Sequence, residues 1–220
     1  MGPLDFNVIL RNLPYLWSGL QLSLLLAALA ISGGIFFGAI MGVLRMSSIR
    51  PVAWLALGYV NFFRSVPLIL VIFWIYFLVP LLLGRATGPF LSAWIAFTLF
   101  ETAYYCEIIR AGVQSIPKGQ ISAGVASGMT RLQAMRHIVM PQAFRNMMPI
   151  LLTQSIILFQ DTSLVYVLSI TDFLGAASKV AQRDGRLVEM YLFAAAVYFV
   201  ISFAASQGVR WLQSRTAIVR

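Results

Sequence analysis

Long apolar runs separated by short polar segments fill most of the chain. A helix needs about 20 apolar residues to cross a hydrocarbon core of roughly 30 Å. Five stretches meet this length: 17–43, 54–83, 90–109, 147–170 and 187–212. Backbone groups in lipid must pair within the protein, so continuous apolar runs of this kind are expected to be helical. The pattern predicts an all-α integral membrane protein with about five transmembrane helices.

The composition agrees with this pattern. Of the 220 residues, 60% are hydrophobic and only 10% are charged, whereas roughly 25% are charged in a soluble globular domain. The net charge is +9, which in a soluble protein would suggest a nucleic-acid partner. Here the basic residues lie mainly between the apolar runs, so we interpret them as a topology signal and as a source of attraction to membrane lipids. No nucleic-acid partner is expected.

The basic residues also predict an orientation, because they concentrate in short cytoplasmic loops. One set of connections carries Arg45, Arg50, Arg110, Lys118, Arg131, Arg136, Arg145, Arg210, Arg215 and Arg220. The opposite set carries Arg11, Arg85, Lys179, Arg183 and Arg186, partly balanced by acidic residues. The first set is therefore predicted to be cytoplasmic, with the N-terminus outside and the C-terminus inside.

Several kinds of site have no residues to support them. The chain has one cysteine, Cys106, and one histidine, His137, so neither an internal disulfide nor a His/Cys metal or haem site is expected. It has no glycine-rich phosphate loop, so any ATP must bind on another chain. It also has no convergent catalytic constellation, and we expect neither enzymatic activity nor a cofactor of its own. The first apolar run lacks the flanks of a cleaved signal and is expected to remain as a span.

The long connection at 110–146 is unusual because it combines small and basic residues without any acid. If its first part is helical, Ser122, Ala123, Ala126 and Ser127 lie on neighbouring turns and form a surface of short side chains. Gly128 suits a turn, since it adopts positive φ without strain. Thr130 can cap a second short helix beginning at Arg131, and Pro141 is expected to stop or bend that helix.

From the residues alone, this connection allows two interpretations. It can dock another protein through its smooth first helix and basic second helix. Alternatively, it can lie on the headgroups as an amphipathic segment, with Arg131 and Arg136 facing phosphate. Both remain open at this point.

The spacing within the connection resembles the cytoplasmic "EAA" loop of ATP-binding-cassette importer permeases. In that loop, Glu-Ala-Ala is followed by three residues, Gly, nine residues, and Ile-x-Leu-Pro. Gly128 and the sequence IVMP ending at Pro141 match this spacing, and Ala123 matches the first Ala. Ser122 stands where the family has Glu, and Gly124 where it has the second Ala. Contact at Ser122 is therefore expected to depend on shape more than on a salt bridge.

Further segments resemble the polar amino-acid uptake permeases in the same order. They are YLWSGLQLSL, NFFRSVPLIL, YYCEIIRAGVQSIPKGQ and QDTSLVYVLS. The chain is identified as a member of this family. Within it, FQDTSLVYVLS followed by QRDGRLVEM most resembles the glutamate/aspartate permeases.

The resemblance implies the type I importer permease fold in a bacterial inner membrane, with one permease domain over 1–220 and a coupling loop at 110–146. It also implies two ATPase subunits that bind ATP and Mg, a periplasmic amino-acid-binding protein, and a second permease, either a homologue or another copy. ATPase coupling would fall on Ser122, Ala123, Ala126, Ser127, Gly128, Arg131 and Pro141. Gly128 and Pro141 would mark the corners of a rigid lever.

Charged groups inside spans are costly and are therefore candidates for function. Asp161, followed by Thr162 and Ser163, can receive the α-ammonium group of an amino acid or can pair with a buried Arg or Lys. Glu101 is equally open between the pathway and a structural role, whereas Glu107 is expected to pair with Arg110 three residues on.

Arg64 is predicted at the cytoplasmic side of the second span. There it can meet a substrate carboxylate or serve at a headgroup or helix end. The outer segment 171–190 mixes both signs of charge, so it is either a solvated loop or a contact for the binding protein. A different class of function is a stand-alone ion-coupled amino-acid carrier using Glu101 and Asp161, although the chain shows no paired inverted repeat.

Overall fold

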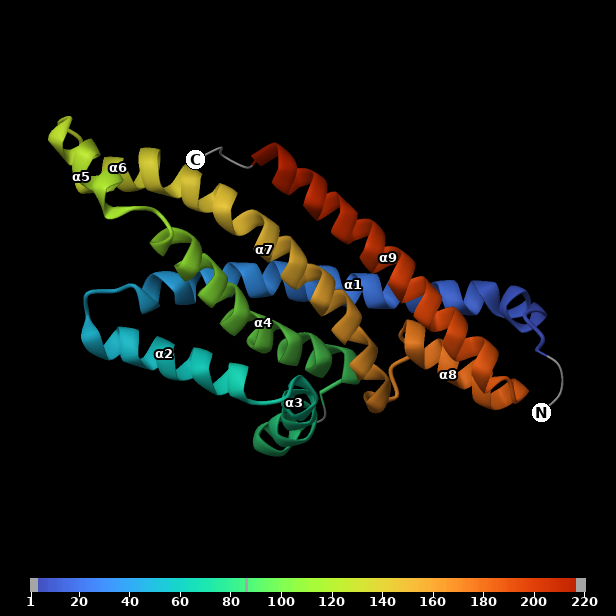
Figure 1. Ribbon diagram of the computed structural model, residues 1–220. Coiled ribbons are helices and arrows are strands. Elements are labelled where there is room, and N and C mark those ends of the chain that lie inside the picture. Colours follow the sequence, from blue (N-terminus) through green and yellow to red (C-terminus); the bar gives the residue numbers. More distant parts are fainter. Residues whose placement is uncertain (1–3, 86, 217–220) are drawn as a thin grey trace.

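The computed structural model describes residues 4–85 and 87–216, and every regular element within them is helical. The bounds are α1 Asn7–Arg45, α2 Arg50–Ser65, α3 Leu68–Leu83, α4 Pro89–Gln114, α5 Lys118–Ala126, α6 Arg131–Ala134, a π-helix Met135–Val139, α7 Met140–Asp161, a 3₁₀ helix Thr162–Leu168, α8 Phe173–Asp184 and α9 Leu187–Thr216. The predicted all-α class is confirmed. In Figure 1, α4 lies between the long α1, the α2–α3 pair and α7.

The packing of α1 on α4 depends on glycines. A Cβ atom added at Gly34 would lie 2.8 Å from the Cβ of Glu101, and one added at Gly38 would lie 2.7 Å from the Cβ of Tyr105. Lipid tails are as apolar as the side chains, so helices in a membrane gain stability from close backbone approach rather than from burial alone. The glycine face of α1 therefore holds α4 at short range.

Three helical segments of the described residues are long and apolar enough to cross a membrane on their own: Asn7–Arg45, Arg131–Leu168 and Leu187–Arg215. The predicted continuous span at 54–83 is wrong. The path of the chain bends by 106° between α2 and α3. Val66, the residue before Pro67, is in an extended conformation at this bend. Proline disfavours helical geometry in the residue before it, which explains the break. The predicted span at 90–109 lies within α4, whose 26 residues include buried Thr98, Glu101 and Thr102.

The segment 110–146 is mostly helical, and α6 continues through the π-helix into α7. Of the two effects predicted for Pro141, stopping or bending the helix, the stop is excluded, because Pro141 lies in the first turn of α7 within the unbroken run Arg131–Leu168. Proline in a helix removes one hydrogen bond and crowds the carbonyl four residues earlier. The π-helix directly before Pro141 has a wider turn than an α-helix. It changes the hydrogen-bond spacing at the point where this crowding would arise.

Two apolar clusters hold the bundle together. The larger one joins α1, α3, α4 and α7 around buried residues such as Ile72, Phe97 and Leu158. The second joins α1, α8 and α9 around Leu16 and Phe173. The region predicted as an outer loop thus contains the helix α8. The apolar face of this helix packs on α1, and its charged face is exposed on the surface of the bundle.

Candidate coupling loop and transport pathway

The small side chains predicted on α5 are at the surface. Ser122, Ala123, Ala126 and Ser127 are all exposed. Gly124, on the opposite side, is buried, and a Cβ added there would lie 2.7 Å from Cδ1 of Ile138. Gly124 therefore lets α5 pack closely on the π-helix. A larger residue at position 124 would require Ile138 to move.

The turn after α5 has the geometry that the sequence predicts. Gly128 has φ +89°, a left-handed conformation that costs glycine little, and the Met129 N–H donates to the Gly124 carbonyl at 3.1 Å. Thr130 then begins α6 with a capping box: the Gln133 N–H donates to Thr130 Oγ1 at 3.2 Å, and the Thr130 N–H donates to Gln133 Oε1 at 2.8 Å. Both predicted roles, the turn at Gly128 and the cap at Thr130, are confirmed.

Between α5 and the segment that follows lies an open groove. It is lined by Lys118, Ile121, Ser122, Val125, Ala126, Arg131 and Met135. Arg131 of α6 lines this groove, whereas Pro141 lies exposed two elements further on, in α7. The groove combines small and apolar side chains with two cationic ones, which suits contact with a protein surface carrying negative charge.

Side-chain hydrogen bonds tie the segment to the helices on either side of it. The Gln142 amide donates from α7 to Gln120 Oε1 of α5 at 2.7 Å. The Asn146 amide donates to Ser115 Oγ, just after α4, at 2.8 Å. These bonds bridge 22 and 31 residues of sequence and connect α5 to α7, and α7 to the segment just after α4.

An ion-pair network lies at the same end of α4. Glu107 pairs with Arg110 as predicted, and it also pairs with Arg45 at the end of α1. The sequence spacing indicated the Arg110 partner but not Arg45, because the second pair depends on how α1 packs against α4.

Glu101 is fully buried between α4, α1 and α7. Gln154 of α7 donates from Nε2 to both carboxylate oxygens, at 3.1 and 3.2 Å. One turn further along, the hydroxyls of Tyr105 and Ser155 form a hydrogen bond of 3.0 Å. Two polar links therefore join α4 to α7 within the membrane part of the bundle. The sequence offered no way to choose Gln154 as the partner.

Asp161 is the last residue of α7, and its side chain is partly exposed. Among the described residues no Arg or Lys forms an ion pair with it. Thr162 is buried and donates to the Phe159 carbonyl at 2.7 Å, while Ser163 is partly exposed. The end of α7 thus presents a carboxylate without a cationic partner in the described part of the chain.

Arg64 lies at the opposite end of α2 from Arg50, about 21 Å away along the helix axis. The helix that contains Arg64 ends just before the bend at Pro67, and the location of Arg64 at the cytoplasmic side stays a prediction. Its guanidinium lies 5.6 Å from the centre of the Tyr104 ring, which is cation–π distance.

The segment predicted as an outer loop is built around α8. The Asp172 carboxylate caps this helix by accepting from the Gly175 and Leu174 N–H groups at 2.9 and 3.2 Å, and burial raises the pKa of Asp172 to about 6. At the far end, the hydrogen bond from Arg183 lowers the pKa of Asp184, and Arg183 also donates to Asn12 of α1 at 2.7 Å. The mixed charges are therefore fixed in place on a helix.

Comparison with known proteins identifies the family. Residues 34–218 match the family described as "Binding-protein-dependent transport system inner membrane component". The chain belongs to this family of permeases. It is 52% identical to "Glutamate/aspartate import permease protein GltK" of Escherichia coli O157:H7, over 99% of this chain and 100% of the relative. It is 33% identical to "Probable glutamine ABC transporter permease protein GlnM" of Bacillus subtilis, over 96% and 98%.

Solved structures of ABC transporters have the same fold as this chain. This permease superposes with a TM-score of 0.92 on a chain from "Crystal structure of an amino acid ABC transporter with histidines", at 31% identity and covering 97% of this chain and 100% of that one. A chain of the MetNI methionine ABC transporter, at 20% identity and a TM-score of 0.72, shares the fold. The predicted type I importer fold and multi-pass inner-membrane location are confirmed, and the alternative of a stand-alone ion-coupled carrier is not supported.

Proposed function

We propose that this permease serves an ATP-driven, binding-protein-dependent importer of glutamate and aspartate. The observation that carries the proposal is the 52% identity to GltK, a protein named as a glutamate/aspartate import permease, along the whole of both chains. The wider set of relatives, named for glutamine, arginine and cystine transport, supports amino acids as the substrate class.

In this proposal the complete transporter contains two ATPase subunits that bind ATP and Mg, a periplasmic binding protein, and a second, homologous permease. The segment 110–146 is the coupling loop of a single permease domain over 1–220. The exposed small face of α5 and the groove beside Arg131 receive the ATPase, and Gly128 sets the angle between α5 and α6. The N-terminus is outside, the C-terminus is cytoplasmic, and the charged face of α8 meets the binding protein.

The proposed pathway runs past the end of α7. Asp161, without a cationic partner among the described residues, receives the α-ammonium group of the substrate, and the partly exposed Ser163 adds a hydroxyl nearby. Thr162 holds the turn through its bond to Phe159. Arg64 is free to swing from Tyr104 to a substrate carboxylate. Glu101, sealed by Gln154, acts by positioning α4 against α7.

Reconstitution in proteoliposomes tests the proposal. The permease is assembled with its ATPase subunits and second permease, and ATP hydrolysis and uptake of labelled glutamate, aspartate, glutamine and histidine are measured with and without the loaded binding protein. We expect hydrolysis stimulated by the loaded binding protein, together with uptake of the two acidic amino acids. Uptake by this chain alone, in the absence of ATP, would overturn the proposal.

A further inference from the structure

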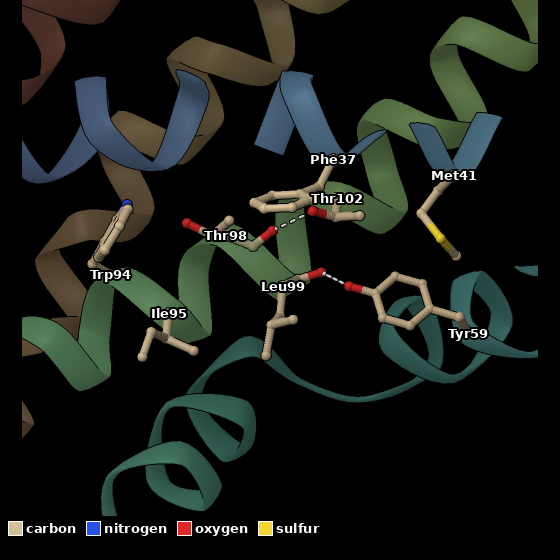
Figure 2. A pocket seen from close by; sticks show the side chains of 8 residues that line it. All are labelled: Phe37, Met41, Tyr59, Trp94, Ile95, Thr98, Leu99 and Thr102. Atoms are coloured by element: carbon tan, nitrogen blue, oxygen red, sulfur yellow. Dashed lines mark hydrogen bonds between the residues drawn. The ribbon is translucent and has the colours of Figure 1, made fainter. Parts of the chain in front are cut away.

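A groove with a distinct chemistry lies between α1, α2 and α4, away from the coupling loop and from Asp161. It is shown in Figure 2 and is lined by Phe37, Met41, Tyr59, Trp94, Ile95, Thr98, Leu99 and Thr102. The volume is about 360 Å³. Its surface is almost entirely apolar carbon, which does not suit a zwitterionic amino acid.

The length and width of the groove can be estimated from the α4 residues that line it. Trp94, Thr98 and Thr102 lie one turn apart on one face of the helix, so the groove runs for about 12 Å along the helix axis. A volume of about 360 Å³ spread over this length leaves a channel well under 10 Å wide. A single alkyl chain fits within a groove of this width, whereas a whole transmembrane helix, 10–12 Å across with its side chains, could only lie over its open side.

Two unsatisfied polar atoms stand at the end of the groove nearer the start of α4. Trp94 Nε1 and Thr98 Oγ1 are buried without a hydrogen-bond partner, and Thr98 as a whole is only 8% exposed. Figure 2 shows both atoms on the same side of the groove. Buried polar atoms without partners are rare and costly, so this pair points to an occupant that carries a hydrogen-bond acceptor.

The other polar groups of the groove are already engaged. The Tyr59 hydroxyl donates to the Leu99 carbonyl at 2.6 Å, and the Thr102 hydroxyl donates to the Thr98 carbonyl at 2.7 Å. The far end of the groove therefore offers only apolar contact. The unpartnered polar atoms lie toward the start of α4, where Trp94 is five residues after Pro89, and tryptophan indoles are common at membrane–water interfaces.

We propose that this groove binds one acyl chain of a glycerophospholipid from the leaflet opposite the coupling loop, with the ester carbonyl accepting hydrogen bonds from Trp94 and Thr98. An ester carbonyl supplies the missing acceptor, and the chain fills the apolar remainder. The lipid occupies the cleft between α2 and α4 and thereby supports the broken α2–α3 segment from its membrane side.

Photo-crosslinking tests this site directly. The assembled transporter is placed in nanodiscs that contain a phosphatidylethanolamine with a diazirine in its acyl chain, and the labelled residues are mapped by mass spectrometry. We expect labelling concentrated on Met41, Leu99 and Thr102. Ile95→Trp, which fills the groove, should lower it at least fivefold, whereas Val200→Trp, on the lipid-exposed face of α9, should leave it unchanged. Met41→Trp provides a second filling variant if Ile95→Trp fails to assemble.

Competition with unlabelled lipid tests the polar end. An ester-linked phosphatidylethanolamine should displace the probe at least fivefold better than its ether-linked analogue, because the analogue lacks the carbonyl that accepts both hydrogen bonds and each bond contributes about 1 kcal/mol. Thr98→Val with Trp94→Phe should abolish that preference. Labelling spread evenly over all lipid-facing helices, unchanged labelling in both filling variants, or crosslinks from Met41→Cys to the second permease would each overturn the proposal.

Discussion

Gln154 of α7 and Glu101 of α4 form a buried link in which one amide nitrogen donates to both carboxylate oxygens. This link joins the two helices that flank the 110–146 segment. A buried carboxylate is tolerated only with compensating hydrogen bonds. The pair therefore fixes α4 against α7, as does the hydrogen bond between Asn146 of α7 and Ser115 just after α4.

Removing the Gln154 side-chain amide should destabilise the protein, because Glu101 would lose its hydrogen-bond donor. Gln154→Leu leaves Glu101 buried without its donor and should lower stability by about 1–3 kcal/mol. The double variant Glu101→Leu with Gln154→Leu should recover most of this loss, because neither polar group then remains. Unfolding can be followed by heating with a thiol-reactive dye, since Cys106 is buried. Additive losses in the double variant would show that the pair does not act as a unit.

The glycine face of α1 gives a second prediction, with a matched control. Gly34→Ala places a methyl group 2.8 Å from Glu101 Cβ and 2.9 Å from Tyr105 Cδ2, so α1 must move away and the transition temperature should fall, at a cost of about 1–3 kcal/mol. Gly58→Ala, on α2, meets nothing within 4 Å and should be neutral or slightly stabilising. Equal effects in the dye assay would contradict close packing of α1 on α4.

The turn at Gly128 is open in space but restricted in backbone conformation. No atom lies within 4 Å of an added Cβ, yet φ is +89°. Gly128→Ala should therefore strain the turn by about 1–2 kcal/mol and re-aim α5. We expect severalfold less uptake per ATP hydrolysed while hydrolysis itself persists. Gly119→Ala, equally open but without positive φ, should leave the ratio of uptake to hydrolysis unchanged. The same ratio in both variants would argue against a rigid lever.

Ser122 stands where the resemblance to the EAA loop would place Glu, and its side chain is exposed with one long hydrogen bond, 3.3 Å to the Lys118 carbonyl. Ser122→Glu should keep uptake within about twofold, because this bond contributes at most about 1 kcal/mol. Ala126→Trp, on the groove beside Arg131, should instead reduce co-purification with the ATPase. Loss of assembly in Ser122→Glu would show that a small side chain is required there.

Asp161→Asn tests the substrate contact. If the carboxylate receives the α-ammonium group, uptake of every amino-acid substrate should fall at least tenfold, since a charged hydrogen bond contributes roughly 1.5–3 kcal/mol. Assembly and the dye transition should stay as in the original protein. Gln160→Ala changes the exposed neighbour and serves as the control. Uptake at the original level in Asp161→Asn would remove this residue from the pathway.

Local signals in the sequence determined much of the structure. Apolar length determined the membrane class, and the segment Gly128 to Arg131 carried its own turn and cap, because positive φ and a capping box are properties of adjacent residues. The Glu107–Arg110 pair was equally local. The family resemblance followed from spacing along the chain, and the comparisons confirm it.

Only the tertiary structure decided the partners that are distant in sequence. Apolar length could not show that Pro67 breaks a span, since hydropathy is the same on both sides of a bend, nor that a π turn carries the helix through Pro141. Gln154 for Glu101 and Arg45 for Glu107 depend on which helix faces which. Nothing in the sequence around Gly34, Gly38 and Gly124 shows that glycine is needed there. The structure shows the need, because neighbouring atoms leave no room for a side chain at any of the three positions.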